Sequence, residues 1–206
     1  MGLTTAVVLV VGGMRPASAT FMIDPNPGGA MFFINGASKD VSTFTGLVGS
    51  NNSGPLVTVD TTGNVDTGNG FSNIKPVKDG TLTDLIFTPD NSTLFSDFSF
   101  RGQLERSGFT GTVDVNVTDQ NGIVSSLVFM GLAGPDADFA RIGVVSLDGE
   151  TIKSVEITTP GSETFKEVKQ IEFSGAGIPA VPEPVSMALL ASGLLGAGLA
   201  YRRKHR

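Results

Sequence analysis

The chain has 206 residues, enough for one ordinary domain with an extra segment at each end, and a formal net charge of −6. It contains no cysteine, which excludes disulfide bonds and thiol chemistry, and its acidic balance makes nucleic acid a poor partner because phosphate is repelled. The only histidine is His205, so the rest of the chain has no imidazole for a Ser-His-Asp or Cys-His arrangement or for a histidine-ligated metal.

The first segment has the character of an export signal. Residues 6–14 form a short apolar core, and Ala17 and Ala19 provide a small-residue cleavage site. We therefore expect residues 1–19 to be a signal peptide and the mature protein to begin at Thr20. No basic residue precedes the apolar core, so we also expect the true start to lie further upstream.

Residues 20–180 form the expected globular domain. When Arg15, Glu183 and the four Arg and Lys residues at the C-terminus are set aside, nine Lys and Arg face nineteen Asp and Glu, a charge of about −10. Gly, Thr, Ser, Asn and Asp are abundant, which favours β-strands joined by turns.

Apolar and polar residues alternate in several short segments, the pattern of strands with one buried face. The clearest case is residues 109–130, where two alternating runs flank the turn at residues 119–122. Its Asn121-Gly122 pair tolerates positive φ and predicts a β-hairpin. A first strand is expected at residues 31–34.

Further elements follow the same pattern. A second hairpin is expected from residues 142–147 and 152–157 around the turn at residues 148–150. Residues 164–170 fit either a strand or one helical turn, because Phe165 and Val168 are three apart.

About eight strands with turn signals every 8–12 residues predict an all-β domain, a β-sandwich or jelly-roll-like fold. No long amphipathic helix is expected before residue 185. The predicted core consists of Phe98, Phe100, Val113, Val115, Val117, Ile142, Val144, Val155, Ile157, Ile171 and Phe173.

The end of the chain combines three features in a fixed order. The motif Val181-Pro182-Glu183-Pro184 is followed by an uncharged apolar run at residues 185–201. A helix of this length reaches about 25 Å, close to the ~30 Å hydrocarbon core of a bilayer. We expect a transmembrane helix over residues 185–201, with its basic end in the cytoplasm by the positive-inside rule. That end, residues 202–206, holds Arg202, Arg203, Lys204, His205 and Arg206.

This order of features resembles the PEP-CTERM sorting signal of Gram-negative bacteria, also called the ice-binding protein C-terminal domain. The resemblance covers residues 181–206. It implies export, recognition of Pro182-Glu183-Pro184 by an exosortase membrane protease, and processing near that motif. The protein would be held in the inner membrane only transiently and then reach the cell surface or the extracellular space, often beside exopolysaccharide or in a biofilm.

One metal site is a candidate. Asp60, Asn64, Asp66 and Asn69 lie in a Gly-rich stretch, expected to be a loop, whose oxygen atoms suit calcium. Their spacing does not match the EF-hand pattern, and such residues also serve as ordinary turn residues that bond their own backbone. Asp136 and Asp138 are a second possible pair. No other cofactor is expected.

Carboxylate chemistry is the remaining route to an enzyme. A glycosidase needs two carboxyl groups about 5–10 Å apart in a cleft. The chain has no Trp, and its one Tyr is Tyr201, so only Phe can stack on a sugar ring in the domain. The available glutamates are Glu105, Glu150, Glu156, Glu163, Glu167 and Glu172.

Taken together, these features favour a non-enzymatic structural or binding module at the cell surface or in the exopolysaccharide matrix. A carbohydrate-binding module, supported by calcium or not, is the alternative, and a carboxylate-dependent glycan hydrolase is the third. The expected partners are the exosortase, the lipid bilayer before processing, and exopolysaccharide.

Overall fold

The structure is a computed structural model that describes residues 21–27, 31–49, 54–90, 95–108, 110–135 and 138–175. These residues form thirteen strands and no helix, which confirms the all-β prediction and exceeds the eight strands expected. The strands are β1 Phe21–Ile23, β2 Met31–Asn35, β3 Ser38–Val48, β4 Leu56–Thr67, β5 Gly70–Phe71, β6 Asn73–Pro76, β7 Asp84–Pro89, β8 Asp97–Leu104, β9 Thr110–Asp119, β10 Val124–Ala133, β11 Ala140–Ser146, β12 Ile152–Thr158 and β13 Phe165–Ser174.

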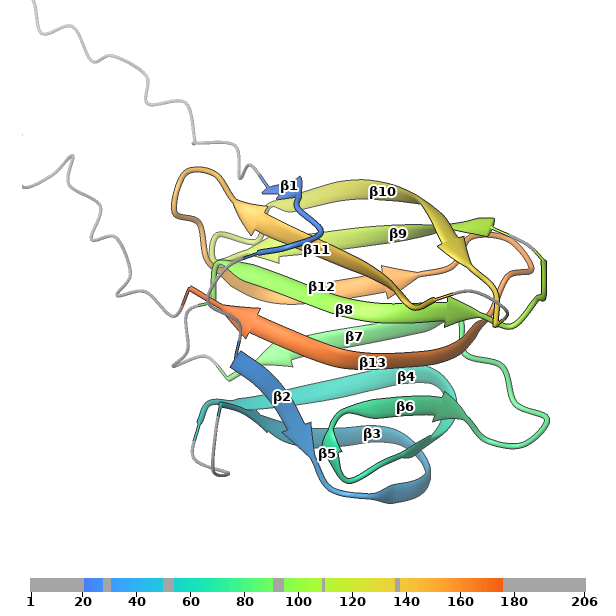
Figure 1. Cartoon of the computed structure of the whole chain (residues 1–206). Coiled ribbons are helices and arrows are strands. Elements are labelled where there is room, and N and C mark those ends of the chain that lie inside the picture. Colours follow the sequence, from blue (N-terminus) through green and yellow to red (C-terminus); the bar gives the residue numbers. More distant parts are fainter. Residues whose placement is uncertain are drawn as a thin grey trace, which may run out of the picture.

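The strands form one hydrogen-bonded path that folds into two layers. Its order is β1-β11-β8-β13-β2-β3-β4-β7-β12-β9-β10, and every pairing along it is antiparallel. One layer contains β1, β11, β8 and β13, and the other contains β3, β4, β7, β12, β9 and β10 (Figure 1). Strand β2 links the layers on one side, where β6 also pairs with both β13 and β4. The fold is a β-sandwich.

Phenylalanine rings fill the space between the layers. The Phe98 ring of β8 lies 5.2 Å from the Phe87 ring of β7, between centroids, and 5.1 Å from the Phe173 ring of β13. Phe87 in turn contacts Phe33 of β2 at 6.5 Å, edge to face. Aromatic pairs in these geometries add to the free energy gained by burying their area.

The predicted core is confirmed, because all eleven side chains proposed for it are buried. In β9 the burial alternates strictly, with Val113, Val115 and Val117 inside and Asp114, Asn116 and Thr118 facing outward. The alternation of apolar and polar residues along β9 therefore shows which face of the strand packs against the other layer.

The first predicted hairpin is also confirmed. Strands β9 and β10 pair from Val124 opposite Thr118 to Ala133 opposite Thr110. In the turn, the buried Asp119 accepts hydrogen bonds through Oδ1 from the backbone N of Asn121 at 2.8 Å and of Ile123 at 2.7 Å.

The second predicted hairpin is wrong. Both strands exist, but β11 pairs with β1 and β8, whereas β12 pairs with β7 and β9. The segment between them crosses from one layer to the other. Buried Glu150 fixes this crossing by accepting hydrogen bonds from Ser146 Oγ at 2.7 Å and from the backbone N of Asp148 at 3.2 Å. A Gly-containing turn serves a hairpin and a layer crossing equally well.

Residues 164–170 resolve as a strand and not as a helical turn. From Phe165 onward they belong to β13, which pairs with β8. The register shifts between Phe165 and Glu167 and again between Lys169 and Glu172, and Gln170 has a φ of 48°. These bulges break the two-residue period, which is why the sequence pattern is ambiguous here.

Candidate functional site

The sorting segment lies outside the described residues. This holds for the motif at residues 181–184, the expected span at residues 185–201 and the basic end, and also for the predicted cleavage site at Ala17 and Ala19. In the part of the chain that the structure describes, no helix has the length and apolar character to cross a bilayer.

Three of the four calcium candidates, Asp60, Asn64 and Asp66, lie on strand β4, and Asn69 follows its end. The expected loop from residue 60 is wrong as far as Thr67, because β4 continues to that residue and buries Val65. Pairing with β3 on one side and β6 on the other keeps this polar stretch extended.

Two of the four candidates are engaged separately. Asp60 Oδ1 accepts a hydrogen bond from Thr43 Oγ1 at 2.7 Å, between β4 and β3. Asn69 Oδ1 accepts one from the backbone N of Ala37 at 2.8 Å, just after β4 ends.

The structure brings the other two together around Asp40, which has a φ of 56° at an irregular point of β3. Asn64 Nδ2 donates to Asp40 Oδ1 at 2.8 Å, and Asp66 Oδ1 accepts from the backbone N of Asp40 at 3.1 Å. Among the described residues no group of three or more His, Cys, Asp or Glu is placed to hold a metal ion. Asp138 is exposed, and Asp136 lies outside the described residues.

The hydrogen bonds at the four calcium candidates are those of ordinary strand and turn residues, which is the alternative to a calcium site. Calcium would have to take oxygens that now accept hydrogen bonds, so we expect millimolar calcium to leave the melting temperature of the protein unchanged relative to a chelator. A calorimetric rise of several degrees with calcium, lost in the Asp66→Asn variant, would contradict this expectation.

A carboxyl pair that the sequence did not indicate lies on the outer face of the layer that contains β7 and β12. Asp84 of β7 and Glu156 of β12 are hydrogen-bonded to each other, and Thr158 Oγ1 donates to Asp84 Oδ2 at 3.1 Å. Partial burial, together with the hydrogen bond to Glu156 and its charge, raises the pKa of Asp84 to about 6. Asn116 Nδ2 donates to Glu156 Oε2 at 2.9 Å. Two carboxyl groups in hydrogen-bond contact are closer than the ~5 Å separation of retaining glycosidases, so this pair does not fit that chemistry.

The pair predicts a pH-dependent stability. The pKa of Asp84 is higher in the folded state than its ordinary 3.8, so the folded state binds the proton more tightly than the unfolded state does. The contribution of Asp84 to the free energy of unfolding therefore falls as the pH rises from about 4 to 6. We expect Asp84→Asn to be more stable than the wild type at pH 8, by about 1 kcal/mol because the site is partly exposed, and to lose this advantage at pH 4. Urea unfolding at both pH values measures it. Asp79→Asn, in an exposed turn, is the control, and an Asp84→Asn difference that does not vary with pH would refute the coupling.

Three of the other glutamates proposed for catalysis are engaged in structural contacts. Glu150 holds the layer crossing, Glu167 lies 3.3 Å from Lys75 Nζ, and Glu172 is paired with Arg141. Glu105 and Glu163 both line one small pocket of about 190 Å³, in which Glu105 is exposed and the buried Oε2 of Glu163 has no hydrogen-bond partner.

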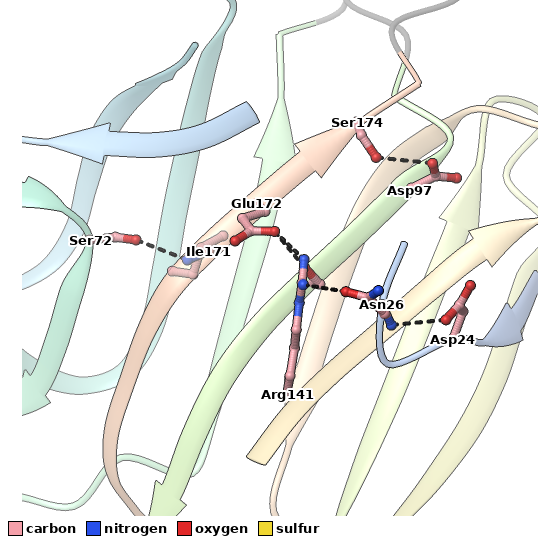
Figure 2. Close-up of polar contacts among 9 residues, drawn as sticks. Asp24, Asn26, Ser72, Asp97, Arg141, Ile171, Glu172 and Ser174 are labelled. Atoms are coloured by element: carbon pink, nitrogen blue, oxygen red, sulfur yellow. Dashed lines mark hydrogen bonds and ion pairs between the residues drawn. The ribbon is translucent and has the colours of Figure 1, made fainter. Parts of the chain in front are cut away.

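Arg141 of β11 ties the two ends of the domain together (Figure 2). Its guanidinium donates to Glu172 Oε2 on β13, to Ser99 Oγ on β8 at 3.1 Å and to Asn26 Oδ1 at 2.8 Å. Asn26 follows β1, and its backbone N donates to Asp24 Oδ1 at 2.8 Å. The guanidinium is therefore shared among three acceptors, and this cluster holds the segment after β1 against the sheet.

A groove of about 570 Å³ lies over β5, β2 and β3. These three strands are in the lower part of the view in Figure 1. Its volume is within the range of small-molecule sites, about 300–1,000 Å³. No charged side chain is among the described residues that line it. The lining residues are Ile34, Asn35, Gly36, Thr45, Gly46, Leu47, Leu56, Asn69 and Gly70.

Two of the glycines that line this groove lie opposite Asn35. Gly46 faces Asn35 across β3 and β2, and a Cβ at Gly46 would lie 2.4 Å from the Phe33 ring. Gly70 faces Asn35 from the other side, across β5, and has a φ of 95° that favours glycine. Of the predicted site residues only Asn69 lies here. The remaining lining residues carry no sequence signal, because the strands they come from, β2, β3, β4 and β5, meet only in the folded chain.

The comparison with protein families bears on the end of the chain. Residues 180–204 match the PEP-CTERM protein-sorting motif. The chain carries a PEP-CTERM sorting signal. This signal indicates an exported protein that is sorted through the membrane by an exosortase-type system. It describes sorting alone, so the ice-binding part of the resemblance has no support.

The domain before the PEP-CTERM signal weakly resembles the solved structures described below. No curated protein matches the chain. A family 29 carbohydrate-binding module from Piromyces equi is similar in structure with a TM-score of 0.39 and 12% identity, over 78% of this chain and 93% of that one. A family 11 carbohydrate-binding module of the Clostridium thermocellum cellulase Lic26A-Cel5E has a TM-score of 0.33 and 13% identity, over 74% and 98%. At these scores neither likeness bears on the ligand of this domain.

Proposed function

We propose that this exported protein acts as a non-enzymatic structural or binding module at the cell surface or in the exopolysaccharide matrix. The observation that carries the proposal is the PEP-CTERM sorting signal at residues 180–204, because such a signal directs a folded domain outward and supplies no chemistry of its own. The domain delivered is residues 20–180, between the predicted signal peptide and the sorting signal.

The proposed route has a membrane stage. The apolar run at residues 185–201 holds the chain in the inner membrane, with the basic residues 202–206 in the cytoplasm. The exosortase then cuts near Pro182-Glu183-Pro184, and the domain reaches the surface without its tail.

Three observations support a binding role over catalysis. The single histidine, His205, belongs to the removed tail. The hydrogen-bonded pair Asp84 and Glu156 lies too close for the spacing of a glycosidase, and most of the other candidate glutamates are engaged in structural contacts.

A carbohydrate-binding module is the second candidate, and the groove over β5, β2 and β3 favours it. A concave site with neutral hydrogen-bonding groups and apolar side chains suits hydroxyl-rich ligands. Calcium held near Asn64 and Asp66 is not needed for this site, because the groove lining includes only Asn69 of the calcium candidates.

Fractionation of a producing strain tests the proposal. We expect the processed protein in the extracellular matrix fraction, and we expect enzymatic digestion of the matrix polysaccharide to release it. Recovery in the periplasm, or the appearance of new reducing ends when the purified protein is added to matrix polysaccharide, would refute it.

A further inference from the structure

We propose that the groove over β5, β2 and β3 binds a segment of a neutral polysaccharide. This inference rests on the proposed function, because it names the ligand class and the site of the binding module.

The groove lining suits the two kinds of surface that a sugar presents. Ile34, Leu47 and Leu56 provide apolar side chains, and Leu56 is 42% exposed. These aliphatic groups can cover the C–H face of a sugar ring, a contact that gains free energy in proportion to the apolar area removed from water.

Polar groups beside them can bond sugar hydroxyls. Asn69 uses its Oδ1 to accept from the backbone N of Ala37, which leaves its NH₂ group as a donor at the groove. Thr45 is exposed and adds a hydroxyl, which both donates and accepts. All of these groups are uncharged.

A row of hydroxyl groups continues from the groove across β3, β4 and β7. Thr45 of β3 pairs with Thr58 of β4, and Thr58 pairs with Thr88 of β7. Their neighbours Phe44, Val59 and Phe87 are buried, so the three threonines share the outer face. The row gives a polymer longer than the groove further hydroxyl contacts.

Charge argues for a neutral ligand. The domain carries about −10, so it repels an acidic polysaccharide, and no Lys or Arg among the described residues lines the groove to offset this. The same lining has no carboxylate, so an amino-sugar polymer gains no ion pair there. With acidic and amino-sugar polymers disfavoured, neutral polysaccharides are the class whose chemistry matches the groove lining.

Affinity electrophoresis tests the inference with the full chain purified in detergent. The gels contain dextran, pullulan, laminarin, galactomannan or xyloglucan as neutral probes, and alginate or chitosan as charged ones. We expect retardation by at least one neutral polysaccharide and a dissociation constant at least tenfold higher for the double variant Leu56→Ser/Asn69→Ala.

The matched control is Leu147→Ser/Asn121→Ala. It makes the same chemical changes at a leucine that is 54% exposed and at an exposed turn asparagine, neither of which lines the groove. We expect this variant to bind like the wild type, and melting temperatures of both variants show that each is folded.

Three results would overturn the inference: retardation by alginate or chitosan alone, no retardation by any neutral probe, or equal weakening in both double variants. If the wild type is found in the matrix fraction but the groove variant binds polysaccharide normally, the groove is not the binding site and the proposed function still stands. Absence from the matrix would instead refute the proposed function.

Discussion

Replacing Pro182-Glu183-Pro184 by three alanines is expected to keep the protein in the membrane fraction and to abolish its release from cells. Proline favours an extended backbone before it and stops a helix, so we expect the motif to be accessible to a protease. Three alanines would instead extend the apolar run at residues 185–201 by almost one helical turn. Immunoblots of membrane and medium fractions measure the change.

Pro179→Ala is the control for this experiment. It removes a nearby proline that lies outside the matched residues 180–204, and release should continue. Normal release of the triple-alanine variant would show that processing does not depend on the motif.

Phe98→Ala is expected to lower the free energy of unfolding by about 3–5 kcal/mol. The Phe98 ring is 1% exposed and contacts three other rings, those of Phe87, Phe100 and Phe173, so both layers lose packing and a cavity remains. Since single domains are stable by only about 5–15 kcal/mol, this change removes a large share of the total.

Denaturant unfolding of the wild type and the variant measures this loss. Met130→Ala, at a side chain that is 79% exposed on β10, is the control and should change stability by less than about 0.5 kcal/mol. A loss below about 2 kcal/mol for Phe98→Ala would mean that the ring cluster does not hold the layers together.

The elements that could be predicted are those set by local pattern. Alternation identified the buried face of β9, and the Asn121-Gly122 turn predicted the pairing of β9 with β10, because Asn-Gly between alternating strands is a strong hairpin signal. The sorting signal was equally readable, since its three features are consecutive in the chain.

The parts that could not be predicted depend on distant pairing. The turn around Gly149 looks like a hairpin turn, and only the pairing of β11 with β8 and of β12 with β9 makes it a crossing between layers. The pKa of Asp84 is raised by its partial burial and by Glu156, which the pairing of β7 with β12 brings beside it. A sequence contains both residues but not their contact.

The candidate groove shows the same limit. Gly46 and Gly70 read as ordinary turn or breaker residues, yet both lie opposite Asn35 once β3 and β5 pair with β2. The calcium candidates failed as a loop for a related reason, since the polar residues of β4 are held extended by two neighbouring strands.

Sedimentation of the purified protein with isolated extracellular matrix tests the central claim most directly. The matrix should come from a strain that lacks the protein, so that its sites are free. We predict that the wild type sediments with the matrix, that soluble matrix polysaccharide competes for it, and that no polysaccharide is shortened. A protein that stays in the supernatant, or one that shortens the polysaccharide, would contradict the account of a non-enzymatic matrix-binding module.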